Sequence, residues 1–324
     1  MKNGSLLNLS NRRKEVNDYI KMDMVAIDPY IKKSVLHSLK GGKRFRSSIV
    51  LGIADSVRSK RALEIEPGDK SAAEIIQNKL PSMYASLAVE YIHCSSLILD
   101  DIHDNDDHRR SMKAVHNAFG NHKAQLSSIY LFGHAVEKLN AATEELSNDN
   151  LAEKECSEIL KSFSSTIKDL SRGQYNDISA QRNLDHDKIT NIISQKTASL
   201  FEMSFVLGWI CGYGMKVVNN KNVNVSSRRE RIDLEKIKLA GQLYGRLYQI
   251  KDDFEDAEKD KDENVPNIVN ELGRERALNM YNDHVGHFHK ILKDLGISPP
   301  ELIEGINYLN VAVAEYYKQS GKRS

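Results

Sequence analysis

Proline is nearly absent from the middle of this chain. The 324 residues include six prolines, and none lies between Pro81 and Pro266. Proline interrupts helices, and proteins built from strands and turns need frequent breaks, so a long proline-free span favours long helices. Apolar residues recur at helical spacing, as at Met83, Leu87 and Tyr91, and long runs of alternating apolar and polar residues are absent. We therefore predict an all-α fold.

No segment has the character of a flexible linker between domains. The helical pattern breaks in four places: Glu66–Asp69, Arg109–Lys113, Asn219–Arg229 and Ser298–Pro300. None of them is a Gly/Ser-rich or Pro-rich linker, and Asn219–Arg229 is expected to be an exposed loop between helices. We expect one domain over residues 1–324, with residues 1–15 as a poorly ordered N-terminal arm.

Charge and cysteine content exclude several classes of protein. Lys and Arg number 46 and Asp and Glu 45, a net charge of +1, so binding to nucleic acid is not expected. Cys94, Cys156 and Cys211 are odd in number and lack metal-binding spacing, which favours a reducing compartment. The first residues lack the apolar core of a signal peptide, and no apolar stretch could span a bilayer. We expect a cytoplasmic protein without a transmembrane segment.

One short acidic pattern occurs twice, as Asp100-Asp101-Ile102-His103-Asp104 and as Asp252-Asp253-Phe254-Glu255-Asp256. Residues three and four positions apart share a helix face, so each copy directs three carboxylates at one small volume. Like charges held so close repel one another unless a cation neutralises them. Oxygen donors without thiolates suit magnesium, which readily shares a substrate's phosphates. Two copies facing each other would enclose a metal–diphosphate. The predicted magnesium ligands are Asp100, Asp101, Asp104, Asp252, Asp253 and Asp256.

The residues around these copies argue against solvated acidic helix faces, the ordinary interpretation of such runs. Glu90–Leu99, which precedes the first copy, is mostly apolar or small. Arg109 and Arg110 follow it, and adjacent arginines can clamp a phosphate with paired hydrogen bonds. In the second copy, Gln249 falls on the helix face that carries the aspartates.

Two other segments offer cations to phosphate groups. In Gly41–Arg46, two glycines permit a tight turn and three cations follow, which indicates a second anion site; solvated bases at a helix start are the alternative. Lys196-Thr197 lies in an apolar stretch, as either a lysine that reaches solvent or a buried phosphate ligand.

His93 lies seven residues before Asp100, two helical turns back on the same face. A diphosphate contact is therefore favoured over an ordinary core histidine. Glu90 and His93 also match the Glu-x-x-His ligand pair of di-iron bundles, but that site needs a second copy and the sequence contains none.

Taken in order, these elements resemble the trans-isoprenyl diphosphate synthases, and among them look most like geranylgeranyl diphosphate synthases. Gly41–Arg46 resembles the family's GGKRxR, and Asp100–Arg110 resembles its first aspartate-rich motif with the arginine pair that follows. The remaining matches are Val115-His116, Phe119-Gly120, Gly173-Gln174 with Asp177, Lys196-Thr197, and Tyr248-Gln249 before Asp252–Asp256. Each element is weak alone, whereas the ordered set is highly specific.

The resemblance implies a single large antiparallel helical bundle around a deep central cavity, of the isoprenoid synthase type and usually a homodimer. It implies three magnesium ions (Mg2+) held between the two aspartate motifs. Isopentenyl diphosphate would be bound by Lys43, Arg46, His93 and Arg110. The allylic diphosphate would be bound by Arg109, Lys196, Thr197 and Gln249. The expected catalytic residues are Lys196, Thr197, which would shield the carbocation, and Gln249.

Several positions depart from the family pattern. They are Ser47 for a proline, Ser111, Lys113 and Ala114 for a glycine, a proline and a threonine, and Ser128-Ile129 for a Gly-Asp. Only nine residues separate Asp256 from Pro266, where relatives carry a longer loop with two lysines and an aspartate. Lys259 and Lys261 are candidates to replace those lysines.

The predicted reaction is magnesium-dependent head-to-tail condensation of isopentenyl diphosphate with an allylic prenyl diphosphate. Two alternatives remain open. The altered residues after Arg110 and the short loop favour a terpene synthase derived from the family. The residues that oppose it are the intact Lys43, Arg46, His93 and Arg110. A non-catalytic subunit of a heteromeric synthase would be expected to lack one aspartate motif, and both are present.

Small residues precede the first acidic copy. The helix face leading away from it passes through Ser96 and Ile92, about 6 Å per step, and a growing prenyl tail is expected to follow that face. Family members that stop at a farnesyl product commonly carry aromatic rings where Ser95 and Ser96 stand. We predict an all-trans product of twenty carbons or more, with geranylgeranyl diphosphate favoured. Tyr91 or Tyr130 is the candidate floor, the side chain that closes the far end of the tail channel. Close helix packing is the alternative role for the two serines.

Overall fold

The protein is all-α, as predicted, in a computed structural model that describes residues 7–66, 69–148, 153–179, 194–213, 227–263 and 265–320. The chain forms two compact units. Unit 1 comprises Met1–Ile159 and Leu207–Asn219, and unit 2 comprises Leu160–Val206 and Asn220–Ser324. Each unit is described by itself, and the expectation of one domain over the whole chain stays a prediction.

Unit 1 begins with a helix where part of a loosely ordered arm was expected. Residues 7–15 belong to α1, which buries Val16 and Ile20. The elements of unit 1 are α1 (Leu7–Asp23), η1 (Met24–Ala26), α2 (Pro29–Leu39), α3 (Phe45–Leu63), α4 (Ser71–Gln77), α5 (Leu80–His103), β1 (His108–Arg109), β2 (Met112–Lys113), α6 (Val115–Phe119) and α7 (Asn121–Asn148). It also includes the start of α8 and the end of α10.

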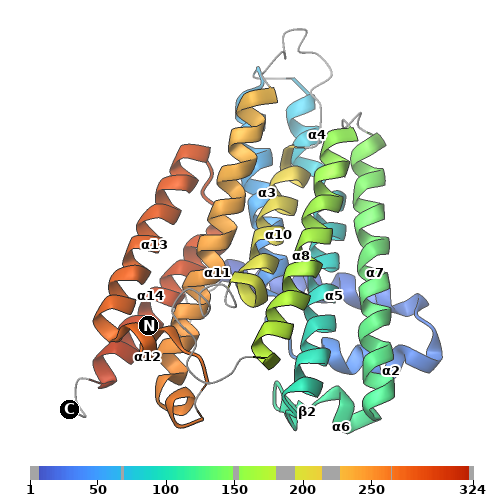
Figure 1. Cartoon of the computed structure of the whole chain (residues 1–324). Helices are drawn as coiled ribbons and strands as arrows, with labels where there is room; N and C mark the ends of the chain where they lie inside the picture. The colour runs from blue at the N-terminus through green and yellow to red at the C-terminus, as the bar shows by residue number, and fades with distance from the viewer. Residues whose placement is uncertain are drawn as a thin grey trace. The chain divides into compact units, whose positions relative to one another are not determined.

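Helices α5 and α7 lie side by side and run antiparallel (Figure 1). Ser95 contacts Ser128, and Tyr91, one turn earlier on α5, stacks near His134, which lies later on α7. α5 carries Pro81 in its first turn, where a missing N–H costs nothing, and no later proline interrupts it. The aspartates Asp100 and Asp101 therefore stand at the far end of a long, mostly buried helix.

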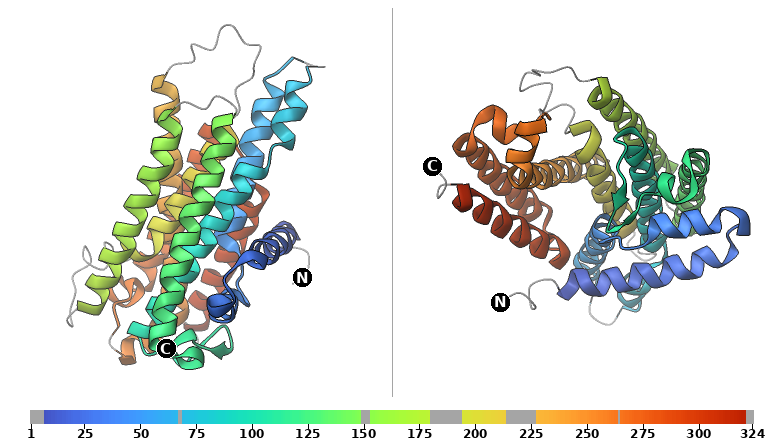
Figure 2. Two further views of the ribbon diagram at one scale, coloured as in Figure 1. Left: turned by 90° about the vertical axis from the view of Figure 1, so that its right-hand side faces the viewer. Right: turned by 90° about the horizontal axis from the view of Figure 1, so that it is seen from below.

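Unit 2 comprises the remaining helices. They are α8 (Glu153–Ser179), the π-helical turn η2 (Ser194–Ala198), α10 (Ser199–Tyr213), α11 (Ser227–Glu263), α12 (Ile268–Leu272), α13 (Arg274–Leu295) and α14 (Pro300–Ser320). α11 contacts α13 and α14, drawn in orange to red in Figure 2. Gly241 and Gly245 let α11 pack closely against α10 and η2. A Cβ at Gly245, for example, would lie 2.5 Å from the Cα of Ala198 in η2.

The predicted breaks fall between elements wherever they are described. Glu66–Asp69 separates α3 from α4, Arg109–Lys113 holds the β1–β2 hairpin, and Ser298–Pro300 precedes α14. Of Asn219–Arg229, residues 219–226 lie outside the described part of the chain, and α11 begins at Ser227. No helix in the described ranges is long and apolar enough to cross a bilayer.

Candidate functional site

The first aspartate motif lies at the end of α5 and is neutralised by an arginine from the following hairpin. Nε of Arg109 donates to Oδ1 of Asp101 at 2.6 Å. The same guanidinium lies 3.1 Å from Asp106 and 3.7 Å from Asp100. Asp101 is buried, and burial raises the pKa of its carboxyl even with Arg109 beside it. Asp104 is exposed at the helix end. Two of the three predicted ligands therefore share one organic cation.

The hairpin that carries Arg109 turns through residues with a left-handed backbone. His108 pairs with Lys113, and the two residues at the turn, Arg110 and Ser111, have φ angles of 52° and 63°. Two positive φ values in a two-residue hairpin are the pattern of a type I′ turn, which glycine adopts most easily. Ser111 stands where the resemblance leads one to expect glycine, so this departure leaves the turn in place but strained.

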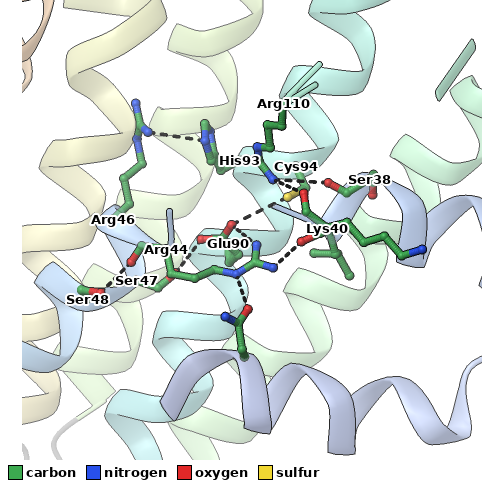
Figure 3. Close-up of polar contacts among 12 residues, drawn as sticks. Ser38, Lys40, Arg44, Arg46, Ser47, Ser48, Glu90, His93, Cys94 and Arg110 are labelled. Carbon is green, nitrogen blue, oxygen red and sulfur yellow. Dashed lines mark hydrogen bonds and ion pairs between the residues drawn. The ribbon is translucent and has the colours of Figure 1, made fainter. Parts of the chain in front are cut away.

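A second cluster of cations lies between α3 and α5 (Figure 3). NH1 of Arg46 lies 3.5 Å from Nε2 of the half-buried His93. Burial and the nearby cations, with Arg46 and Arg110 foremost, hold the pKa of His93 well below its usual value, so the ring is neutral. Arg110 donates to the carbonyl of Lys40 at 3.2 Å, and Lys43 is exposed. The predicted anion ligands Arg46, His93 and Arg110 are thus neighbours.

The pairing of two residues in this region was not predicted, and it removes one of the three cations of Gly41–Arg46 from the anion site. Arg44 is buried and pairs with the equally buried Glu90 at 2.5 Å, across the interface between α3 and α5. Glu90 also accepts a hydrogen bond from Ser47 at 2.9 Å. Its carboxylate is therefore committed to an arginine and a serine, which removes the di-iron interpretation. The available signal was a carboxylate in an otherwise apolar helix, because such a group needs a buried partner.

The second aspartate motif, on α11, is neutralised from its own helix. Nζ of Lys251 donates to Asp252 at 2.8 Å and also pairs with Glu255. Asp253 is 3% exposed, and burial raises the pKa of its carboxyl to about 6. Burial and neighbouring carboxylates raise the pKa of the exposed Asp256 as well.

Asp253 also joins α11 to the start of α12. Its Oδ2 accepts the backbone N–H of Ile268 at 2.9 Å, and its backbone carbonyl accepts from Nδ2 of Asn267 at 2.9 Å. Asn267 caps α12 through its own Oδ1, which accepts from the N–H of Val269 at 2.9 Å. One predicted metal ligand is therefore also a structural anchor.

A hydrogen-bonded chain connects Asp253 to the π-helical turn η2. Nε2 of Gln249 donates to Oδ1 of Asp253 at 2.8 Å, as the predicted shared face requires. Oε1 of Gln249 accepts from the hydroxyl of Thr197 at 2.9 Å. Gly173 permits α8 to meet this turn, because a Cβ there would lie 2.7 Å from the backbone nitrogen of Lys196. Thr197 and Gln249, two predicted catalytic residues, are thus in direct contact.

The donor set of both motifs suits magnesium in type. All the donors are carboxylate oxygens, and the raised pKa values of Asp101, Asp253 and Asp256 reflect buried or crowded negative charge. Among the described residues, no three His, Cys, Asp or Glu side chains converge on one point. Magnesium binding would therefore require Arg109 and Lys251 to yield contacts. Each motif belongs to its own unit, and a shared metal–diphosphate site stays a prediction.

Comparison with known proteins agrees with these motifs. The family model for polyprenyl synthetase matches residues 28–270. The chain belongs to this family. It is 29% identical over 247 residues to geranylgeranyl pyrophosphate synthase 12 of Arabidopsis thaliana, a chloroplastic relative; the match spans 74% of this chain and only 58% of that protein.

Solved structures share the fold of this chain. The geranyltranstransferase of Thermotoga maritima superposes with a TM-score of 0.70 at 22% identity, covering 95% of this chain and 99% of that one. A geranyltransferase of Helicobacter pylori, complexed with magnesium and isoprenyl diphosphate, has a TM-score of 0.69 at 23% identity and covers 97% and 99%. The isoprenoid synthase fold predicted from the resemblance is confirmed.

In this chain, helix stands in part of the segment after the second motif where relatives were expected to carry a longer loop. α11 continues to Glu263, and Nδ2 of Asn267 donates to Asp260 at 2.8 Å. Lys259 and Lys261 are both exposed on that extension. Their proposed replacement of the missing loop lysines stays a prediction.

The residues expected to set chain length have different surroundings. Ser95 is buried, and its hydroxyl lies 2.8 Å from that of Ser128 on α7, which matches the packing alternative. Ser96 is half-buried and bonds only locally, to the carbonyl of His93 at 2.9 Å. Ile92 is buried. The candidate floor residues, Tyr91 and Tyr130, both lie against His134 on α7.

Proposed function

We propose that this protein condenses isopentenyl diphosphate with an allylic prenyl diphosphate in a magnesium-dependent prenyl transfer. The observation that carries the proposal is the second anion cluster, in which Arg46 and His93 lie 3.5 Å apart beside Arg110. An enzyme that only ionises one prenyl diphosphate needs the aspartate motifs but has no use for a second diphosphate site. Family membership and the named activities of the relatives support the same reaction class.

The chain's own residues can bind and orient both substrates. Arg46 and Arg110 offer charged donors to isopentenyl diphosphate, and a neutral His93 adds one N–H without losing a proton. Arg109, Lys196 and the Thr197–Gln249 pair are proposed to bind the allylic diphosphate. Bound magnesium would supply Lewis-acid stabilisation of the charge that develops on the leaving diphosphate.

The Thr197–Gln249 pair is suited to shielding a carbocation. Because Nε2 of Gln249 is bound to Asp253, its Oε1 is held on the other side of the amide, against the hydroxyl of Thr197. The two oxygens form one fixed dipolar group, which can stabilise positive charge without attacking it. We propose that the released diphosphate accepts the proton, so no side-chain base is assigned.

The direct test is to incubate purified protein with labelled isopentenyl diphosphate and allylic primers of ten, fifteen and twenty carbons, with and without magnesium. Elongation that requires both substrates and magnesium is the expected result. Products formed from the allylic diphosphate alone would support the terpene synthase alternative. Complete inactivity that a second protein restores would support the heteromeric subunit alternative.

Arg46→Ala tests the separate diphosphate site. Loss of a charge-assisted contact should raise KM for isopentenyl diphosphate about ten- to hundredfold and leave KM for the allylic substrate nearly unchanged. Arg13→Ala, which removes an exposed arginine of α1, is the matched control. Equal increases for both substrates would contradict separate sites.

We propose a product of twenty carbons or more, limited along the face of Ser96 and Ile92. Ser96→Phe should shorten the product towards farnesyl while sparing the first condensation, and Ser96→Ala should leave the distribution unchanged. An active Ser96→Phe enzyme with the original products would show that this face does not line the tail channel.

We also propose a cytoplasmic homodimer. α7 exposes a helical stripe of Leu126, Ile129 and Val136, at 58%, 67% and 42%, which a second copy could cover. Light scattering should give twice the chain mass for the wild type and the chain mass for Ile129→Arg. A wild-type monomer would contradict the proposal.

A further inference from the structure

A buried ion pair joins the start of α3 to α5, next to the second anion cluster. Arg44 and Glu90 are 4% and 1% exposed, and NH1 of the arginine lies 2.5 Å from Oε1 of the glutamate. Nε of Arg44 donates to Asn17 at 2.9 Å, and NH2 donates to the carbonyl of Leu39. The other oxygen of Glu90 accepts from the hydroxyl of Ser47 at 2.9 Å. Arg44 thereby ties α1 and the end of α2 to α5 (Figure 3).

The backbone around Arg44 is shaped to put this side chain inside. Arg44 has a φ of 56°, a left-handed conformation that side chains rarely adopt. A Cβ at Gly42 would lie 2.4 Å from NH1 of Arg44 and 2.9 Å from NH1 of Arg110, so any side chain at this position would collide with both guanidinium groups. Strained backbone persists only where its surroundings over-determine it, and here the polar contacts of Arg44 do so.

The ion pair sets the register of the two helices that carry the anion cluster. Glu90 and His93 lie one turn apart on α5. Arg44 and Ser47 meet Glu90, and Arg46, which lies between them in sequence, meets His93 at 3.5 Å. α3 and α5 are therefore joined at two successive turns, and the Arg44–Glu90 contact is the shorter and more buried of the two.

The ion pair also distinguishes Arg44 from the other two cations of the Gly41–Arg46 segment, Lys43 and Arg46. Glu90 cancels the charge of Arg44, and burial keeps that guanidinium away from any ligand in solvent. Lys43 is exposed and Arg46 half-buried, so both lie nearer to solvent than Arg44.

We propose that Arg44 and Glu90 are positioning residues of the isopentenyl diphosphate site. They hold α3 against α5 so that Arg46 and His93 can bind the same diphosphate. Neither residue touches substrate. The inference rests on the function proposed above for the Arg46–His93 cluster, and its test separates the two.

The main test is Glu90→Gln, which keeps the shape of the side chain and removes its charge. KM for isopentenyl diphosphate should rise about tenfold, because α3 loses its register against α5, while KM for the allylic substrate and kcat at saturation change by less than about threefold. A general loss of packing would move all three parameters together. Arg44→Lys, which keeps the charge balance but loses the contacts with Asn17 and Leu39, should show the same selective rise. Glu90→Asp should recover part of the wild-type KM.

A second ion pair on α3 supplies the control. Arg58 is 3% exposed and pairs at 2.6 Å with the half-buried Asp55, which also pairs with Arg12 of α1. Asp55→Asn should lower the melting temperature without changing KM for isopentenyl diphosphate. A rise in that KM equal to the rise in Glu90→Gln, or no change in Glu90→Gln or Arg44→Lys, would overturn the inference.

Calorimetric titration with inorganic diphosphate in the absence of magnesium measures the affinity of the Arg46–His93 cluster for diphosphate without turnover. Weaker binding by Glu90→Gln and Arg46→Ala, but not by Asp55→Asn, is expected. If the wild type binds diphosphate in this way yet never uses isopentenyl diphosphate, the proposed function fails and the positioning role stands. If Glu90→Gln binds diphosphate as tightly as the wild type, the positioning role fails.

Discussion

The two aspartate motifs carry aspartates at the same three positions but are held in different ways. The first receives its cation from outside its helix, because Arg109 reaches Asp100 and Asp101 from a strained hairpin. The second receives its cation from within, because Lys251 is the residue before it on α11. The second also contributes Asp253 to the start of α12, a contact without counterpart in the described surroundings of the first.

This difference teaches that a repeated pattern does not imply a repeated structural role. Arg109 belongs to a short hairpin outside α5, and it is proposed above to bind the allylic diphosphate. Loss of the Asp253 side chain would also affect the folded structure, since it accepts hydrogen bonds from both Gln249 and Ile268. We expect the first motif to act mainly in ligand binding, and the second to act in binding and stability.

The largest expected effect is shared by both motifs. Asp100→Ala and Asp253→Ala should each lower turnover by about a thousandfold or more, because each removes a proposed ligand from a metal that stabilises the leaving group. Steady-state assays over a magnesium series provide the measurement. Near-normal rates in either variant would exclude that motif from the metal site.

The pH dependence of the unfolding free energy tests the titration of Asp253, the buried member of the second motif. The pKa of Asp253 rises from 3.8 to about 6 on folding, so its contribution to stability is full below pH 3.8 and is lost as the pH rises through 6. Asp253→Asn cannot titrate. Relative to the wild type it should gain up to about 3 kcal/mol of unfolding free energy between pH 4 and 7, measured by urea unfolding without magnesium.

An asparagine at this position can keep the local hydrogen bonds. Its amide oxygen can accept from Ile268, and the Gln249–Thr197 chain can reverse its direction, since both side chains donate and accept. Parallel pH profiles for Asp253→Asn and the wild type would show that Asp253 is not the titrating group.

The two neutralising cations should differ in their effect on substrate. Arg109→Gln should raise KM for the allylic diphosphate about ten- to hundredfold, because this arginine is proposed to transfer from carboxylate to phosphate. Lys251→Gln should leave that KM unchanged within about twofold, since its ammonium is held by Asp252 and Glu255 on the same helix. A larger increase in this KM for Lys251→Gln than for Arg109→Gln would refute the proposed difference between the two cations.

Stability should be more sensitive beside the second motif than beside the first. Asn267→Ala removes a buried cap of α12 and the contact with the Asp253 carbonyl, which should cost about 2 kcal/mol in urea unfolding. Asn117→Ala is the matched control beside the first motif, because its exposed amide bonds to Asp107 at 3.0 Å. That change should cost less than about 0.5 kcal/mol.

The smallest expected effect concerns the hairpin of the first motif. Ser111→Gly should stabilise the protein by up to about 1 kcal/mol, because glycine adopts the positive φ without steric cost. Thermal unfolding measures the gain, and Ser111→Ala should show none. A destabilised glycine variant would indicate that the serine side chain makes the turn.

Sequence rules predicted the features that depend on neighbours along one helix. The long helix α5 follows from the absence of proline after Pro81, and the contact of Gln249 with Asp253 follows from their four-residue spacing. Both are local consequences of helix geometry.

Features that depend on how helices meet were beyond those rules. Arg44 lies 46 residues from Glu90 in sequence, and their pairing depends on the register of α3 against α5, which no periodic pattern encodes. The same holds for Arg109, whose partners are determined by the turn of a hairpin, and for the role of Asp253 in capping α12. In each case a charged group was recognised but its partner was not.

The reciprocal hydrogen bonds between Ser95 and Ser128 limit how this protein could diverge. Each hydroxyl bonds to the backbone carbonyl of the other residue at 3.0 Å, so the two helices touch at this point with no room for a ring. An aromatic substitution at Ser95 would separate α5 from α7 before it shortened any product. Selection for a shorter product, in nature or in the laboratory, should therefore pass through Ser96 first, and changes at Ser95 should arise only together with a change at Ser128.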